Sequence, residues 1–266
     1  LELARRLDAH ANIANAQYEL ARIAREKSDL ETAAHLLAES FALREQLGDN
    51  SGIAEVLFLQ AAVCHDLQEF TQANELALRA ISIQEEIGDH RHRIQTWHLL
   101  AEIALHGRAA FQEAEEYCRR AIALCNEQQE AAELAQVSST LAETYRLQGK
   151  LQDAYALATK CLELSQRMGS RQLQALYLFR LSKINADLGN LPLALQQGLS
   201  SLALCRETHE RIAIMYVLEH IGQLYHILHQ PAQELQMWRE ALAVAQELNH
   251  PLSTELGERL KFHVDQ

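Results

Sequence analysis

An alanine that returns about every 40 residues constrains the fold of this chain more than any other feature. Its five occurrences are Ala33, Ala73, Ala114, Ala154 and Ala194, and Glu234 holds the next position. Seven residues after each comes a second small side chain, followed directly by a large apolar one. These second small residues are Ser40, Ala80, Ala121, Cys161, Ser201 and Ala241. A fixed period of this length indicates one supersecondary unit repeated along the chain.

A third row of small residues lies upstream in each unit, in most cases directly after a leucine or isoleucine. Its members are Ala21, Ala61, Ala101, Ala142, Ser182 and Gly222. Between the upstream and downstream rows lies a short break, such as Gly149 or Gly189, and glycine can take the left-handed conformation that ends a helix. Pro192 and Pro231 follow such breaks, where the first turn of a new helix tolerates proline. Each unit is therefore expected to be two antiparallel helices held close by small residues.

Composition agrees, since glycine (10) and proline (3) are scarce among 266 residues rich in helix-forming side chains. We expect one solenoid domain over residues 1–266, excised from or part of a longer protein, and a terminal or capping helix over 251–266. The expected hairpins span approximately 10–48, 51–88, 91–129, 131–169, 171–209 and 211–249. Leu1 to Leu3 match the register of Leu162 to Leu164, which predicts that the chain starts inside the second helix of a preceding unit.

The register resembles that of the tetratricopeptide repeat. Trp97, Leu100 and Ala101 fit the opening of that family's pattern, and its tyrosine and alanine-pair positions are fitted by Tyr145, Tyr225, Ala73 and Ala80. The repeat here is about 40 residues long instead of about 34, so both helices must be longer. Arrays of this length resemble kinesin light chain-type adaptors and the sensor regions of bacterial maltose-activator-like regulators and signal-transducing ATPases. The resemblance implies an all-α, right-handed α-solenoid of about six stacked helical hairpins, with the first helix of each unit lining a concave surface.

Several function classes are disfavoured. A net charge of −12 argues against direct contact with a nucleic-acid backbone, which needs a basic face. No apolar run approaches the roughly 18 residues of a membrane span. No phosphate loop, nucleophile elbow or HExxH motif occurs, so we expect no enzyme activity, no catalytic residue and no cofactor. The five cysteines lack metal-ligand spacing and favour a reduced, cytoplasmic protein, and the histidine pair His226 and His229 does not predict a metal site.

Three equivalent positions of the first helices provide a candidate binding surface. The first position carries aromatic or polar residues: Tyr18, Phe58, His98, Ser139, Phe179 and Glu219. The other two positions carry charged or imidazole groups in several repeats: Arg22, Glu102, Glu143 and Lys183, then Arg25, His65 and Arg146. If these first helices line a groove, aromatic rings alternate there with charges of both signs. The alternative is that the rings pack against the neighbouring helix as core.

The sequence thus favours a sensor or interaction module of a larger, bacterial-type regulatory protein. Its partner would be a protein, a peptide or a small-molecule effector, without nucleic acid or membrane, and self-association is compatible with the sequence. Two alternatives stay open: a constitutive scaffold that joins two proteins, and an accessory domain of an enzyme whose catalytic domain lies outside this chain.

Overall fold

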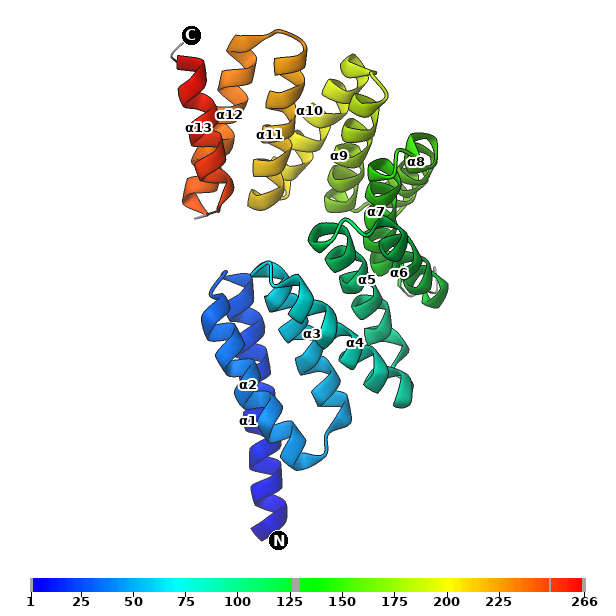
Figure 1. Ribbon diagram of the computed structural model, residues 1–266, viewed down its shortest axis with the longest axis vertical. Helices are drawn as coiled ribbons and strands as arrows, with labels where there is room; N and C mark the ends of the chain where they lie inside the picture. Colours follow the sequence, from blue (N-terminus) through cyan, green and yellow to red (C-terminus); the bar gives the residue numbers. More distant parts are fainter. Residues whose placement is uncertain (1, 126–129, 249, 265–266) are drawn as a thin grey trace. The chain divides into compact units, whose positions relative to one another are not determined.

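The computed structural model describes residues 2–125, 130–248 and 250–264 and confirms the all-α class. These residues form 13 helices and no strand, and consecutive helices pack as antiparallel hairpins (Figure 1). The first helices of the hairpins are α1 (Glu2–Glu26), α3 (Asn50–Asp66), α5 (His90–Gly107), α7 (Ala131–Leu147), α9 (Arg171–Asp187) and α11 (Arg211–Ile227). The second helices are α2 (Leu30–Leu47), α4 (Phe70–Glu86), α6 (Phe111–Leu124), α8 (Leu151–Arg167), α10 (Leu191–Glu207) and α12 (Pro231–Glu247). The last helix is α13 (Leu252–Val264).

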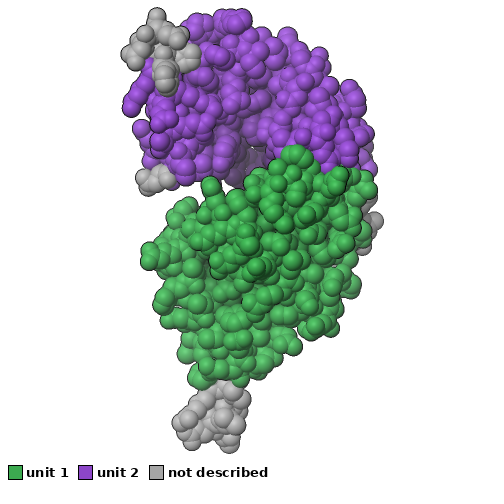
Figure 2. Space-filling model, in the orientation of Figure 1, with its two compact units in different colours: residues 1–140 green, residues 141–266 purple. Residues whose placement is uncertain are grey.

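The chain divides into two compact units, residues 1–140 and residues 141–266 (Figure 2). The boundary falls inside α7, so the last turns of that helix belong to the second unit. We describe each unit by itself.

The small residues of the repeat lie where the helices of each unit pack against each other. Ala21, Ala61, Ala101, Ala142 and Ser182 are all fully buried, and so are the five alanines of the row that begins at Ala33. Such close contact requires small side chains, because a larger one would hold the helix axes apart. Helix starts are also encoded locally: Asp49, Asp89 and Ser170 each accept a hydrogen bond from a backbone N–H of the first turn.

One expectation about the N-terminal end is wrong. Helix α1 runs without interruption from Glu2 to Glu26, so residues 2–9 continue the first helix instead of ending a preceding one. The segment lacks the Gly-Asp or Gly-Ser break that separates the later units, and its Ala, Leu and Arg residues favour continued helix. Among the described helices α1 packs on α2 and α3, and Leu20, whose equivalents Leu100 and Leu181 are buried, is 53% exposed.

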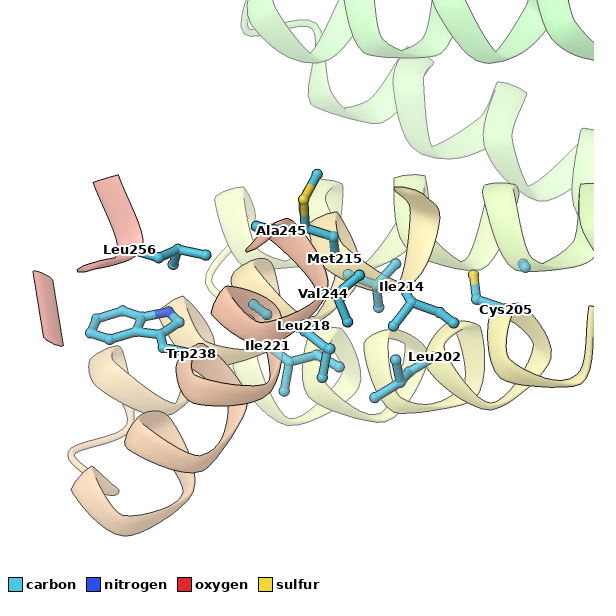
Figure 3. Packing of buried hydrophobic residues seen from close by; sticks show 13 residues of the cluster. Leu202, Cys205, Ile214, Met215, Leu218, Ile221, Trp238, Val244, Ala245 and Leu256 are labelled. Atoms are coloured by element: carbon cyan, nitrogen blue, oxygen red, sulfur yellow. The ribbon is translucent and has the colours of Figure 1, made fainter. Parts of the chain in front are cut away.

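The core of the second unit includes a close contact between α11 and α12 at Trp238 (Figure 3). Trp238 packs beside Ile221 and Leu256 in this core. A Cβ atom on Gly222 would lie 2.2 Å from the indole ring of Trp238, so only glycine fits beneath it. The earlier repeats have alanine or serine at the position of Gly222 and a smaller residue than tryptophan at the position of Trp238. The loss of a side chain on α11 therefore makes room for the larger side chain on α12.

Candidate ligand-binding surface

Most of the expected site residues lie on the first helices and are partly accessible. Tyr18, Phe58, His98 and Phe179 are half-buried. The Arg44 guanidinium lies 5.5 Å from the centre of the Tyr18 ring, and the Lys183 ammonium 5.8 Å from that of Phe179. These rings thus pack against neighbouring side chains and still present part of their surface to solvent.

A side-chain contact about 41 residues apart links neighbouring first helices within each unit. In the first unit Arg25 Nε donates to Asp66 Oδ2 at 2.7 Å. One repeat later, at the same position, His65 Nε2 lies 3.2 Å from His106 Nδ1. The second unit places Arg146 and Asp187 there. The position is therefore a recurrent bridge between repeats, formed by an arginine–aspartate pair in two places and by a histidine pair in the third.

The bridge in the second unit belongs to a larger ionic cluster around Glu143. This carboxylate is only 7% exposed and accepts hydrogen bonds from Arg146 Nε and Nη2, both at 2.9 Å, and from Lys183 Nζ at 2.6 Å. Arg180 Nη1 lies 3.3 Å from Oε2 of the same carboxylate. Burial alone raises the pKa of Glu143, but the bonds from Arg146 and the charges of Arg180 and Lys183 outweigh burial and hold the pKa far below its usual range.

The cations of this cluster outnumber its carboxylates. Arg146, Arg180 and Lys183 share Glu143 and Asp187, so the cluster carries a net positive charge in a chain of net charge −12. Burial lowers the pKa of Lys183, and the attraction of Glu143 compensates only in part. An acidic ligand group would restore the balance of charge.

His220 of α11 lies beside this cluster and is held in one tautomer. Ser182 Oγ donates its only proton to the carbonyl of Ala194 at 2.7 Å, so it must accept from His220 Nε2 at 2.9 Å. Burial, then the charges of Lys183 and Arg146, lower the pKa of His220 to about 4. The imidazole is therefore neutral at pH 7, and Phe179 packs against it edge-on.

Two pockets adjoin along the same helices of the second unit. The first, of about 280 Å³, is lined by Arg146, Lys183, Ala186, Asp187, His220, Gln223, Leu224 and Ile227. The second, of about 370 Å³, is lined by Gln223, His226, Ile227, Trp238 and Arg259. Because Gln223 and Ile227 line both, we call the two together the α11 trough. The part that the two pockets share is formed by the amide of Gln223 and by Ile227, which is 52% exposed.

At the far end of the α11 trough the two ionisable lining residues, Arg259 and His226, each pair with carboxylates that do not themselves line the pocket. Arg259 Nη1 bonds Glu219 at 2.7 Å and its other nitrogen bonds Glu255, while His226 Nδ1 lies 3.0 Å from the buried Glu234. Three carboxylates therefore surround one arginine and one histidine. Glu234 stands where five earlier repeats have alanine, so this position of the repeat holds a buried carboxylate only in the α11–α12 hairpin.

The remaining expected residues are less engaged. Arg22 is exposed and pairs with Glu19 and Glu26 of its own helix. Glu102 lies 3.8 Å from His98, which bonds Thr140 Oγ1 at 2.8 Å.

Of the residues that line the α11 trough, the sequence analysis proposed only Arg146 and Lys183 as site residues. It missed Asp187, His220, Ile227, Trp238 and Arg259 among the lining residues, and Arg180 of the ionic cluster. Asp187 could have been found from its spacing, because it follows Arg146 by the same 41 residues that separate Arg25 and Asp66.

Neither a metal cluster nor a membrane span is found where the structure is described. In that part of the chain no three His, Cys, Asp or Glu side chains gather to hold a metal ion. None of the described helices is long and apolar enough to cross a bilayer.

Comparison with known proteins identifies the fold through structure alone, since no family model and no curated protein matches the sequence. A signal transduction ATPase with numerous domains from Pyrococcus horikoshii, which carries a tetratricopeptide repeat sensor, matches 91% of this chain with a TM-score of 0.71 and 15% identity. The match covers 37% of that protein. The fold is that of a tetratricopeptide repeat array.

Two further structures share this fold. The Rap conjugation gene regulator of plasmid pLS20, solved in complex with the Phr* peptide, matches 90% of this chain and 64% of its own, with a TM-score of 0.73 and 12% identity. Kinesin light chain repeats from Podosopora anserina match 76% of this chain and 98% of their own, with a TM-score of 0.61 and 18% identity. The resemblance to sensor and adaptor arrays is thus confirmed at the level of fold.

Proposed function

We propose that this chain is the sensor or interaction module of a larger regulatory protein and acts by binding a protein or peptide, not by catalysis. The observation that carries the proposal is the α11 trough, a pair of adjoining pockets with a buried ionic cluster at one end. The fold shared with a regulator that was solved with a peptide, and with an ATPase that carries a repeat sensor, supports the same function.

The ionic cluster is poorly explained as a device for stability. Glu143 is buried, and the side chains of Arg146, Arg180 and Lys183 around it are only 15–25% exposed. The cost of withdrawing these charges from water offsets much of their attraction. Well-packed apolar residues would hold two helices together equally well. Charges kept in fixed positions beside an open pocket instead suit the recognition of a charged partner.

We extend the proposal to the accessible residues of the first helices in residues 1–140. Half-buried aromatic rings are favourable anchors, because they bury a large area at low entropic cost. The residues concerned are Tyr18, Arg22, Arg25, Phe58, His65, His98 and Glu102. In residues 141–266 they are Arg146, Phe179, Lys183 and Glu219, together with the buried Glu143, which bonds Arg146 and Lys183.

Selection from a random peptide library displayed on phage tests this function. Peptides enriched on the immobilised chain would be resynthesised and titrated against the parent and an Ile227→Glu variant, which places a charge where the two pockets of the α11 trough meet. We expect binding to weaken at least tenfold, because truncated or charged central contacts cost most at such surfaces. Arg171→Ala is the matched control: Arg171 begins α9, and its ion pair with Glu207 is exposed and distant in sequence from the trough. Failure to enrich any peptide, or enriched peptides that bind Ile227→Glu as well as the parent, would refute the proposal.

A further inference from the structure

We infer that the chain forms a dimer in which α1 pairs in antiparallel orientation with α1 of a second copy. The inference concerns the first unit alone and does not depend on the α11 trough. The surface that carries it is a row of exposed apolar residues on α1, which we call the α1 seam: Ala9, Ile13, Ala16, Leu20 and Ile23.

The α1 seam is exposed although equivalent positions are buried in the later hairpins. Ile13, Leu20 and Ile23 are 49%, 53% and 40% exposed. The residues equivalent to Ala16 and Ile23 are at most 2% exposed in every later hairpin. They are Val56, Thr96, Val137, Tyr177 and Val217, and Val63, Ile103, Thr144, Ile184 and Leu224.

The second helix of the preceding hairpin buries these positions in the later repeats. Val56 and Val63 of α3, for example, share one hydrophobic core with Ala33 and Leu37 of α2. Among the described helices α1 packs only on α2 and α3, so it has no such helix before it. The α1 seam is therefore a helix-binding face that nothing in the described part of the chain covers.

Helix α1 also lacks the break at which a preceding second helix could turn back onto the seam. Helices α3 and α5 begin at Asn50 and His90, each directly after a capping aspartate. The equivalent position in α1 is His10, where the helix continues without interruption to Glu2. We therefore assign the cover of the seam to another molecule.

The spacing within the α1 seam is that of a coiled coil. Its members are four, three, four and three residues apart, which is the alternation of the a and d positions of a heptad. In an antiparallel pair the a positions of one helix face the d positions of the other. Leu20 then lies over Ala16 of the second copy, and Ile13 over Ile23.

This arrangement makes the seam complementary to itself, as a two-fold interface requires. Each Leu20–Ala16 layer combines a large side chain with a small one, which lets the two helices interdigitate at close range. A parallel pair would instead place Leu20 against Leu20 and leave two alanines facing each other.

The charges of the chain also favour α1 as the meeting surface. Helix α1 contains four arginines and four acidic residues, so its formal charge is zero in a chain of net charge −12. Two copies therefore meet there without the repulsion that an acidic surface would cause. The exposed residues in the described part of α13, at the other end of the chain, are polar: Thr254, Glu255, Glu258 and Lys261. An apolar seam has no counterpart there, which favours a closed dimer over an open stack of copies.

Sedimentation equilibrium of the purified chain tests the dimer. Because so short a seam buries less than a standard interface, we expect a dissociation constant on the order of 10–100 μM. Leu20→Glu should raise this constant about tenfold or more, because it places a charge in two layers of the dimer. Leu78→Glu, at an exposed leucine of α4 in the same unit, is the matched control and should leave it unchanged. Circular dichroism checks that both variants fold.

Mixing two variants tests the antiparallel order. Ile13→Glu and Ile23→Lys should each dimerise poorly alone, since each leaves a charge opposite an isoleucine. In an antiparallel mixed dimer the new glutamate faces the new lysine, so the equimolar mixture should associate about tenfold more tightly than either variant alone. In a parallel pair the two positions lie ten residues apart, and mixing changes nothing. A mixture of Ile13→Glu with Leu78→Lys is the control.

Three results would overturn the inference. The first is a chain that stays monomeric up to the highest concentration reached. The second is a Leu20→Glu variant that dimerises as tightly as the parent, which would place the interface elsewhere. The third is a mixture of Ile13→Glu and Ile23→Lys that associates no more tightly than its components, which would exclude the antiparallel pairing.

Discussion

Lowering the pH from 7 to 5 should destabilise residues 141–266 through His220. This imidazole is 8% exposed and donates from Nε2 to Ser182 Oγ. Burial, Lys183 and Arg146 lower its pKa to about 4 from the ordinary 6.5, against the smaller opposite effects of Asp187 and Glu143. The folded state therefore binds a proton less readily than the unfolded state.

The sign and size of the effect follow by linkage. Because the folded pKa is depressed, the stabilisation is fully present above pH 6.5 and disappears as the pH falls towards 4. Between pH 7 and pH 5 the unfolded state gains a proton at this site while the folded state stays neutral, which lowers the free energy of unfolding by about 2 kcal/mol.

Urea unfolding at the two pH values measures this loss, with the fluorescence of Trp238 as the probe. The chain has two tryptophans, so a Trp97→Phe background leaves Trp238 alone to report on the second unit. His220→Gln removes the titration but keeps a donor for Ser182 Oγ, and its stability should fall by about 2 kcal/mol less than that of the parent over the same pH interval. Carboxylates that titrate in both proteins cancel in this difference.

Nuclear magnetic resonance gives the pKa itself, and Lys183→Met tests its cause. The His220 ring signal should titrate with a midpoint near 4 in the parent and at a higher pH in the variant, where one repelling cation is missing. A parent midpoint near 6.5, or the same loss of stability in His220→Gln and parent, would refute the reasoning.

Three further predictions concern packing and charge. Gly222→Ala should lower the free energy of unfolding by about 1–3 kcal/mol, because the new Cβ would overlap the Trp238 ring. Adding Trp238→Leu should restore part of this loss in a thermal melt. Absence of any rescue would contradict the explanation that Gly222 makes room for Trp238. Ala142→Leu should cost about 1–3 kcal/mol by overpacking a fully buried contact, and a melting temperature within a degree of the parent would show that the contact is loose. Glu143→Gln should cost about 3 kcal/mol in urea unfolding, because it leaves three half-buried cations short of a carboxylate. The exposed Glu116→Gln should change stability by less than about 1 kcal/mol, and equal effects of the two variants would contradict the role of the cluster.

The sequence was sufficient to predict the hairpins and the helix contacts, because both depend on spacing along one helix. Small residues repeated at a fixed position, such as Ala101 and Ala154, predict a close approach of a neighbouring helix backbone at that position. This prediction does not depend on how the more distant parts of the chain fold. Leu20 shows the limit of that reasoning. It occupies the same register as buried leucines, yet its exposure depends on which helices pack on α1.

The ionic cluster could be predicted only in part, because it depends on contacts between helices. Glu143, Arg146 and Lys183 were recognisable as charges on the first helices. Their convergence on one carboxylate depends on the relative register of α7 and α9, and Arg180 joins them from a position that holds Leu59 and Leu99 in earlier repeats. The equivalent positions of the other repeats hold Glu19, Leu59, Leu99, Thr140 and His220. No shared residue type marks a charged site there, so the period that reveals the fold hides this member of the cluster.

Comparison of equivalent bridges explains how a repeated scaffold acquires a local site. Arg25–Asp66 and Arg146–Asp187 occupy the same position between neighbouring repeats. Beside the first bridge, the position equivalent to Glu143 holds Arg22, which is exposed and pairs within its own helix. Beside the second, Glu143 is buried and draws in cations from two helices. The scaffold contact is the same in both places, but the residues beside it differ: Glu143, Arg180 and Lys183 stand where the first unit has Arg22, Leu59 and Ala62. These changes together concentrate charge at the mouth of a pocket. Sites in such arrays should therefore be sought where a recurrent bridge keeps its spacing while the residues beside it change.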